Sequence, residues 1–352
     1  MTPAVSVIIA AYNGASLIGE TIVSLSRQTL TDFEVVIVDD RSTDTTREVL
    51  RAIGDPRFRV IEAEANQGPV RTRNRALAAA RGRHIAALDQ DDLCAPDRLR
   101  AQFDYLEAHP DVVLVASAAD VLEDGTLSPS PLPAVTTPAL VEWMLWVCNP
   151  LVWSSVMVRG DVARRLDPFS RPEILYAEDF DLYHRLSAFG RIARIDTPLL
   201  HYRRHAGGAS QRYTDTMQAS ATRVLAERHA DIWGTDTEAR AALLVRHVML
   251  GAPVPDRATL LELGATLTAL QAAFITQRRP SAEDRKLIRW QTARLWARIG
   301  RAGLRSGQLA LMDVMAVRPD HLGLGYAGLD ALVRSRLVGA ARGATNRFRR
   351  SN

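Results

Sequence analysis

The strongest constraint on the fold is an alternation of two residue patterns between Val5 and Ser117. Five short apolar segments rich in β-branched residues predict buried strands at 5–11, 33–38, 57–61, 84–88 and 111–117. Helical periodicity predicts helices between them, at 16–28, 44–53, 69–81 and from Pro96 onward. Repeated strand–helix units of this length favour an α/β fold with a mostly parallel sheet covered by helices on both faces.

Three of the predicted strands end on residues of the kind that a ligand site needs. These are Tyr12-Asn13, Asp39-Asp40 and Asp89-Gln90-Asp91-Asp92. Parallel sheets of this class bind ligands beyond the carboxyl ends of their strands. We therefore predict a functional site at this edge of the sheet.

The run from Asp89 to Asp92 packs three carboxylates into four positions. Carboxylates this close repel one another at neutral pH unless a cation lies among them. Oxygen ligands suit magnesium or manganese, and magnesium commonly shares its coordination shell with substrate phosphates. The alternative is a solvated acidic turn that caps the helix at Pro96.

The chain is long enough for about two domains. Residues 119–140 are rich in Pro, Ser and Thr and predict a surface loop, and the pattern beyond Thr214 is helical and alanine-rich. We expect an α/β domain at 1–212 and an α-helical domain at 213–352.

Cys94 and Cys148 are too few for a disulfide framework, which favours a reducing compartment. We expect neither a leader peptide nor a membrane span.

Charge is concentrated in the last part of the chain. The formal net charge is +4, but residues 281–352 carry 14 basic and 5 acidic side chains, a net +9. An amphipathic helix predicted at 283–305 places arginines 294, 298, 301 and 305 in one stripe. This pattern suits docking on anionic lipid headgroups, and the alternative is an ordinary helical domain with a solvated arginine face. Nucleic acid is not an expected partner, because no binding motif accompanies the charge.

Several motifs together resemble glycosyltransferase family 2, an inverting family with the GT-A fold. They are the strand-end motifs above, Asn66-Gln67-Gly68 with Arg73-Asn74, and Glu178-Asp179 followed by Tyr202-Arg203 and His205. The resemblance covers about Val5 to Ser210. It implies a mixed, mostly parallel nucleotide-sugar-binding sheet followed here by the helical domain.

The resemblance also implies roles on the donor side. Asp39 would accept the uracil N3 hydrogen, which selects UDP, and Tyr12 would stack on the base, with Asn13 and Asp40 in the same motifs. Arg73 would lie near the nucleotide, although Arg71 could take that part. Asp91 would bind Mn²⁺ or Mg²⁺ directly, and Asp89 would bind the ribose or support the metal. Asp92 could instead cap the following helix.

On the acceptor side the resemblance implies that Asp179 is the general base and that Glu178 positions the acceptor or supports the structure. Both acids are expected to open a helix, and Asp181 lies two residues further on. Gly207 and Gly208 beside Arg203 and His205 predict an arm that closes over the diphosphate, with His205 completing the metal shell.

The function implied is a metal-dependent inverting transfer from a UDP-sugar to a hydroxyl of a glycan or lipid-linked acceptor, in cell-surface polysaccharide synthesis. The expected location is cytoplasmic, peripheral on the inner face of the membrane. Two alternatives stay open: a nucleotidyltransferase, and a module that keeps the fold but only binds sugars or partners.

Overall fold

The computed structural model describes residues 2–130, 132–205, 207–208, 212–317 and 329–350, with side chains in the last range from 331 to 341. Ala209 and Ser210, which follow the predicted arm at Gly207-Gly208, and the arginine side chains at 342, 347, 349 and 350 lie outside the described residues. The chain divides into two compact units, one of residues 1–141 and 150–220 and one of 142–149 and 221–352. The domain limit at 212/213, which predicts that residues 1–212 and 213–352 fold as separate domains, stays a prediction.

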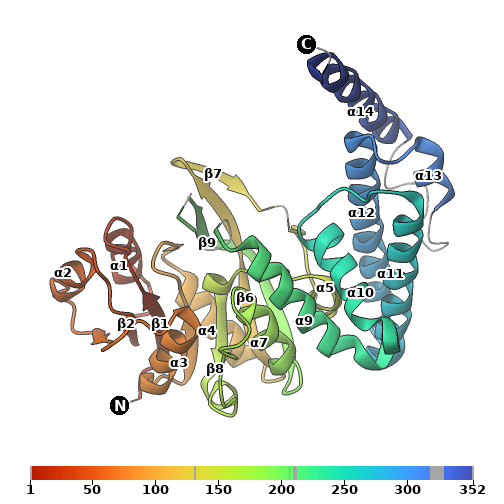
Figure 1. Ribbon diagram of the computed structural model, residues 1–352. Coiled ribbons are helices and arrows are strands. Elements are labelled where there is room, and N and C mark those ends of the chain that lie inside the picture. The colour runs from red at the N-terminus through yellow and green to blue at the C-terminus, as the bar shows by residue number, and fades with distance from the viewer. Residues whose placement is uncertain (1, 131, 206, 209–211, 318–328, 351–352) are drawn as a thin grey trace. The chain divides into compact units, whose positions relative to one another are not determined.

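The first unit is built on one mixed sheet in which nine strands are described, in the order β3-β2-β1-β4-β8-β6-β9-β5, with β7 paired to β6 (Figure 1). The strands are β1 Val5–Ala11, β2 Phe33–Asp39, β3 Phe58–Glu62, β4 His84–Ala87, β5 Leu93–Cys94, β6 Val112–Glu123, β7 Thr126–Pro129, β8 Val156–Arg159 and β9 Arg191–Arg204. The first four pair in parallel, whereas β8 is antiparallel to both β4 and β6. The expected α/β architecture, a mixed sheet flanked by helices, is confirmed; of the described strand pairings, four are parallel and four antiparallel.

Helices connect and cover these strands. They are α1 Ile18–Ser26, α2 Thr46–Arg51, α3 Pro69–Ala79, α4 Arg98–Ala108, α6 Gly160–Ala163 and α7 Glu178–Leu186, with a short 3-10 turn, η1, at Trp153–Ser155. The core lies between the sheet and these helices, because β1 and β2 are buried along nearly their whole length. Burial on both faces is what their unbroken apolar sequences predict.

The predicted surface loop at 119–140 is wrong at both ends, because strands occupy most of residues 119–129 and the helix α5 (Pro138–Val147) begins at Pro138. β6 continues to Glu123 and turns back into β7 through Asp124 and Gly125, whose φ angles are 48° and 76°. Two consecutive residues with positive φ form the tight turn that Asp-Gly favours between antiparallel strands. The Asp-Gly pair was therefore a hairpin signal inside a polar segment.

The second unit is helical. Its helices are α9 Thr214–Trp233, which begins in the first unit, α10 Thr237–Leu243, α11 Arg257–Arg278, α12 Ala282–Ser306, α13 Leu311–Ala316 and α14 Leu329–Arg350. The end of α5 (Pro138–Val147) packs with them: the Trp143 indole donates to Thr292 Oγ1 at 3.0 Å. α14 lies so close to α12 that a Cβ at Gly339 would meet the Leu304 carbonyl.

One described helix, α11, is long and apolar enough to cross a membrane by length and composition. In the structure 44% of its most apolar window is buried, and Leu263, Leu267 and Leu270 pack inside the helical unit. A core helix of a globular domain meets the same criterion.

Candidate active site

The carboxyl ends of β1, β2 and β4 meet at one edge of the sheet, since Ala11 pairs with Asp39 and Ile8 with Ala87. The loops that follow are tied together. Asn13 Oδ1 accepts from the Thr43 amide at 2.8 Å, and the Tyr12 amide donates to Gln90 Oε1 at 2.9 Å. A Cβ at Gly14 would meet the end of the Gln90 side chain, which would have to move to admit it. The Tyr12 ring remains exposed beside this frame.

Asp39 and Asp40 are both buried, and they face different partners. Asp39 accepts from the Ser42 amide at 3.1 Å and from the Ser42 hydroxyl. Asp40 accepts from the amides of Gln67 and Gly68, both at 2.8 Å, and thereby holds the loop that leads into α3. Asp39 thus lies at the strand-end edge, and Asp40 shapes the loop that delivers Arg73.

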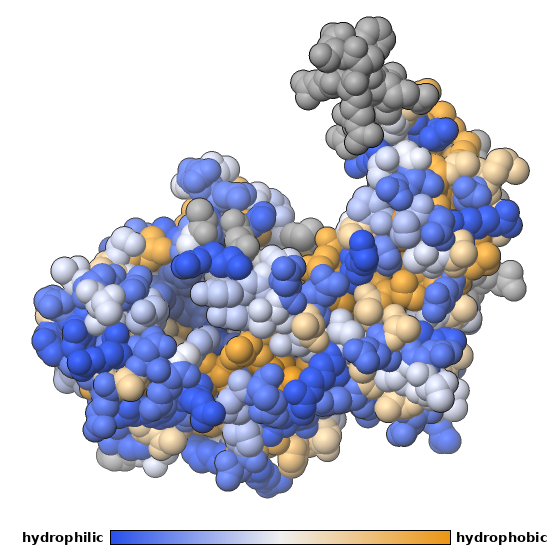
Figure 2. Space-filling model, in the orientation of Figure 1, coloured by the Kyte–Doolittle hydropathy of each residue, from blue (hydrophilic) through white to orange (hydrophobic). Residues whose placement is uncertain are grey.

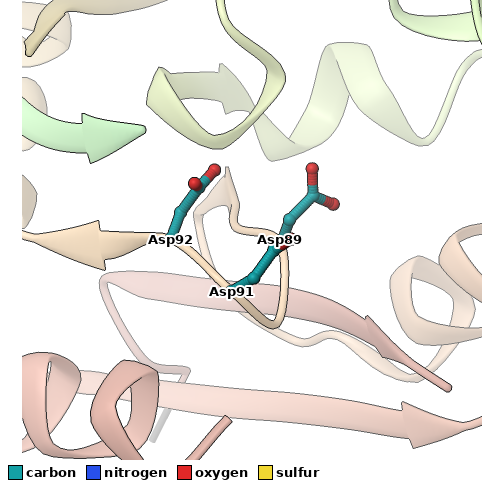
Figure 3. A group of neighbouring side chains, drawn as sticks. All are labelled: Asp89, Asp91 and Asp92. Atoms are coloured by element: carbon teal, nitrogen blue, oxygen red, sulfur yellow. The ribbon is translucent and has the colours of Figure 1, made fainter. Parts of the chain in front are cut away.

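Asp89, Asp91 and Asp92 come from one loop between β4 and β5 (Figure 3), and one ligand atom from each lies within 4.8 Å of the others. Burial raises the pKa of Asp91, and the charge of Asp89 raises it further, although His205 works in the opposite direction. Burial and the charges of Asp91 and Asp89 raise the pKa of Asp92 well above its usual range, although hydrogen bonds from Ser154 and from the Arg203 amide work in the opposite direction. These mutually repelling carboxylates, of which Asp92 is buried and Asp89 and Asp91 are half-buried, are a donor set that fits a divalent cation.

The fit extends to an oxygen without a protein partner. Asp92 Oδ1 accepts from the Arg203 amide at 2.8 Å, whereas the buried Oδ2 has no hydrogen-bond partner among the described residues. Asp92 does not cap the following helix, because α4 begins at Arg98 with Asp97 at its N-cap position. The interpretation of Asp92 as a cap is therefore wrong, and its carboxylate belongs to the acidic cluster.

Arg73 of α3 links the acidic loop to the start of α7. Its Nη2 lies 2.8 Å from Asp89 Oδ1, and its Nη1 pairs with Glu178 Oε1. Burial alone would lower the pKa of Arg73, but the charges of Asp89 and Glu178 raise it well above the usual value. Arg71 is exposed and makes no ion pair within the described ranges, so of the two arginines only Arg73 reaches the carboxylates.

Glu178 and Asp179 open α7, as the sequence predicts. Glu178 is buried, and Asp179 is half-buried, close enough to Arg73 for its charge to raise the arginine's pKa. Asp181 points into other contacts, pairing with Arg171 at 2.6 Å. The structure thus separates Asp181 from the pair that Arg73 brings toward the acidic loop.

Arg203 and His205, at the end of β9, lie against the acidic loop. Arg203 Nε donates to the Asp91 carbonyl at 2.9 Å, and its Nη2 pairs with Glu20 at 2.7 Å. His205 Nε2 lies 2.8 Å from Asp91 Oδ2. Pairing of β5 with β9 causes this approach, because Leu93 stands opposite His201.

Sequence reasoning missed four residues around this site. The Ser154 hydroxyl accepts from the Asp89 amide at 3.0 Å, and the Trp153 ring lies 5.0 Å from the Arg73 guanidinium. The Gln90 side-chain amide donates to the Tyr12 carbonyl at 3.0 Å. Burial and the charge of Asp179 raise the pKa of the buried Tyr183 hydroxyl. Trp153 and Ser154 stand in an apolar stretch that carries no motif, so only the fold reveals them.

A hollow of ≈ 730 Å³ lies at the opposite edge, where β1 and β4 begin. Its lining includes Arg81, Arg83, His84 and Glu107. Arg83 and His84 both pair with Glu107, and Arg81 pairs with Glu34. The paired charges and the absence of a described carboxylate cluster there place the candidate active site at the other edge.

Comparison with known proteins identifies the class. The family model "Glycosyl transferase family 2" matches residues 6–154. WfaP of Escherichia coli, a UDP-Glc:alpha-D-GlcNAc-diphosphoundecaprenol beta-1,3-glucosyltransferase, is 30% identical over 58% of this chain and 79% of its own length. The chain belongs to glycosyl transferase family 2, and it is a glycosyltransferase rather than a nucleotidyltransferase or a silent binding module.

Two further proteins are similar to the chain. The succinoglycan biosynthesis protein ExoO of Rhizobium meliloti is 40% identical over 40% of this chain, a match that spans 42% of ExoO. The crystal structure of S. aureus TarS 1-349 in complex with UDP-GlcNAc superposes with a TM-score of 0.54 at 19% identity, covering 97% of this chain and 92% of that one. The likeness to TarS confirms the GT-A fold.

Proposed function

We propose that this glycosyltransferase moves a sugar from a UDP-sugar to a hydroxyl of a glycan or lipid-linked acceptor with inversion, in cell-surface polysaccharide synthesis. The observation that carries the proposal is the link through Arg73 between the acidic loop and Glu178-Asp179. Support comes from WfaP, whose name gives UDP-Glc and a diphosphoundecaprenol acceptor, and from ExoO in succinoglycan biosynthesis. TarS was crystallised with UDP-GlcNAc.

Mn²⁺ or Mg²⁺ would be held by Asp91 and Asp89, with the free oxygen of Asp92 in the same cluster and His205 beside Asp91. A divalent ion there offsets the negative charge that develops on the leaving diphosphate. Arg203, which is fixed to Asp91 and Glu20, adds a positive charge beside the same loop.

Asp179 is the proposed base. It takes the proton from the acceptor hydroxyl while that oxygen forms a bond to the anomeric carbon and the bond from this carbon to UDP breaks. Glu178, buried and paired with Arg73, holds the start of α7 in place for this step. On the donor side, Asp39 and Tyr12 are the proposed uracil contacts, with Asn13 and Asp40 as the frame that holds them.

Thermal unfolding with nucleotides tests this function. UDP should raise the melting temperature in the presence of Mn²⁺ or Mg²⁺ and much less with a chelator, because a ligand stabilises the state that binds it. GDP is the matched control, since guanine offers a different pairing edge to Asp39. Equal shifts of the melting temperature with UDP and GDP would contradict the role of Asp39. A shift with UDP that is the same with and without the metal would contradict the metal site.

We further propose a peripheral, cytoplasmic location on an anionic membrane surface, through α13 and α14. Large apolar side chains are exposed there: Met312 is 75% and Leu337 64% accessible. Figure 2 shows hydrophobic patches among hydrophilic ones over these helices. Arg334 and Arg336, also exposed, flank Leu337 on the outward face of α14, an arrangement suited to shallow insertion among anionic headgroups.

Flotation with vesicles checks this location. The full chain should float with phosphatidylglycerol vesicles and not with phosphatidylcholine ones, and Leu337→Asp should abolish flotation. Leu127→Asp, at an apolar residue of β7 that is 48% exposed, is the matched control. Flotation of Leu337→Asp at the wild-type level contradicts the proposal, and a change of oligomeric state in that variant assigns the face to a second copy of the chain.

A further inference from the structure

Two tyrosines form a stacked pair next to the acids that open α7. The rings of Tyr176 and Tyr213 have centroids 4.3 Å apart and planes within 5° of parallel. Tyr176 precedes Glu178 by two residues, and Tyr213 lies immediately before α9. The pair therefore joins two segments far apart in sequence at the place where the proposed base is located.

The backbone at Tyr176 is unusual. Its φ of 62° is in the left-handed region, which is unfavourable for a bulky side chain. Such a conformation persists only where the surrounding structure imposes it, and it is concentrated at functional sites. Here it sets the ring of Tyr176 against Tyr213 directly before Glu178 and Asp179.

The pair is not a buried packing contact. Tyr213 is 39% exposed and Leu175 beside the pair is 38% exposed, so a ligand can reach it from solvent. The Arg212 guanidinium lies 5.8 Å from the Tyr213 ring centre and adds hydrogen-bond donors at the edge. Burial, the Tyr213 hydroxyl and the charge of Glu178 raise the pKa of Tyr176 to about 12, so its phenol stays a donor at neutral pH.

We propose that Tyr176 and Tyr213 form the platform on which a pyranose ring of the acceptor packs, with its nucleophilic hydroxyl toward Asp179. This inference rests on the proposed function of Asp179 as base. A pyranose presents C–H groups on its faces and hydroxyls at its rim, which match an exposed aromatic surface bordered by phenol and guanidinium donors. The acceptor class that this platform fits is a sugar rather than a simple alcohol.

Saturation-transfer NMR on the full chain with UDP and the diamagnetic ion Mg²⁺ tests the platform. The probes are the methyl pyranosides of glucose, galactose and N-acetylglucosamine, with glycerol as the simple alcohol. At least one pyranoside should receive saturation on its ring C–H protons. Tyr213→Ala should weaken its binding about fivefold, whereas Tyr213→Phe should retain it, because the stacking face and not the hydroxyl supplies most of the contact.

Phe189→Ala is the matched control, since Phe189 is 41% exposed just beyond the other end of α7. This variant should bind the pyranoside like the wild type. In Tyr213→Ala the melting temperature and the Kd for UDP should be unchanged, and with an accepted pyranoside KM should rise while kcat stays within about twofold.

The platform is overturned if none of the three pyranosides binds to the wild type, if glycerol binds equally well, or if Tyr213→Ala binds the pyranoside unchanged. A loss of kcat alone in Tyr213→Ala also overturns it, because that pattern indicates a structural effect on the base. Failure of the wild type to bind UDP, measured separately by calorimetry, would instead refute the proposed function.

Discussion

The carboxylates at the two edges of the parallel strands have pKa values shifted in opposite directions. Where the strands begin, Glu34 accepts from Arg81 and from the Ser6 hydroxyl, and although burial raises its pKa these hydrogen bonds bring it below the usual value. Where the strands end, the half-buried Asp91 and the buried Asp92 lie beside like charges, and their pKa values are raised. Paired carboxylates serve stability, whereas crowded ones cost stability and are suited to bind a cation.

The largest expected effect lies at the carboxyl edge, at the proposed base. Asp179→Asn removes the proton acceptor and keeps the shape of the side chain, so transfer should fall by about a thousandfold. The Kd for UDP, measured by calorimetry, should stay within about twofold, because the proposed base acts on the acceptor and not on the nucleotide. A variant that loses UDP affinity would move Asp179 to the donor site.

Asp91→Asn tests the crowding itself. Transfer should fall on the order of a hundredfold, since a charged oxygen ligand is lost. The melting temperature without metal should rise, because one of three repelling carboxylates becomes neutral. The increase in melting temperature that UDP causes should no longer depend on Mn²⁺. A lower melting temperature without metal would show that Asp91 contributes to stability like the paired carboxylates, and the contrast between the edges would fail.

Glu34→Ala tests the opposite edge. It should lower the free energy of unfolding by about 2 kcal/mol, because buried hydrogen bonds from Ser6 and Arg81 lose their acceptor. The kcat of the folded enzyme should not change. Glu107→Ala is the control, with a smaller expected loss because the Glu107 side chain is 37% exposed. Urea unfolding measures the free energy of unfolding of both variants. Equal losses in the two variants would contradict the expectation that the more buried carboxylate contributes more to stability.

The smallest expected effect is in the pH dependence of stability. The folded-state pKa of Glu34 lies below its ordinary value of 4.5, so its contribution is complete above that value and is lost as pH falls through the folded-state pKa. The difference in unfolding free energy between wild type and Glu34→Gln should therefore be constant from about pH 6 to 8 and shrink below about pH 4. A difference that grows on acidification would contradict the sign of this pKa shift.

Local patterns were sufficient for the first four strands and for the loops that end them, because β-branched runs and polar strand ends are short-range signals. They failed at 119–129, where a polar composition hid the Asp124-Gly125 hairpin. Residues 142–149 precede the predicted domain limit but belong to the helical unit, and Trp143 packs there. That contact joins positions 149 residues apart, which no local pattern encodes.

The amino-acid sequence by itself determined the family, the parallel strands and the carboxylates that end them, since each depends on residue type and near-neighbour spacing. Tertiary structure alone decided that Arg73 and not Arg71 joins Asp89 to Glu178, and that Asp92 joins the acidic cluster instead of capping a helix. The reason is geometric: two residues on a helix face different directions, and which direction holds a carboxylate is set by strands and helices distant in the chain.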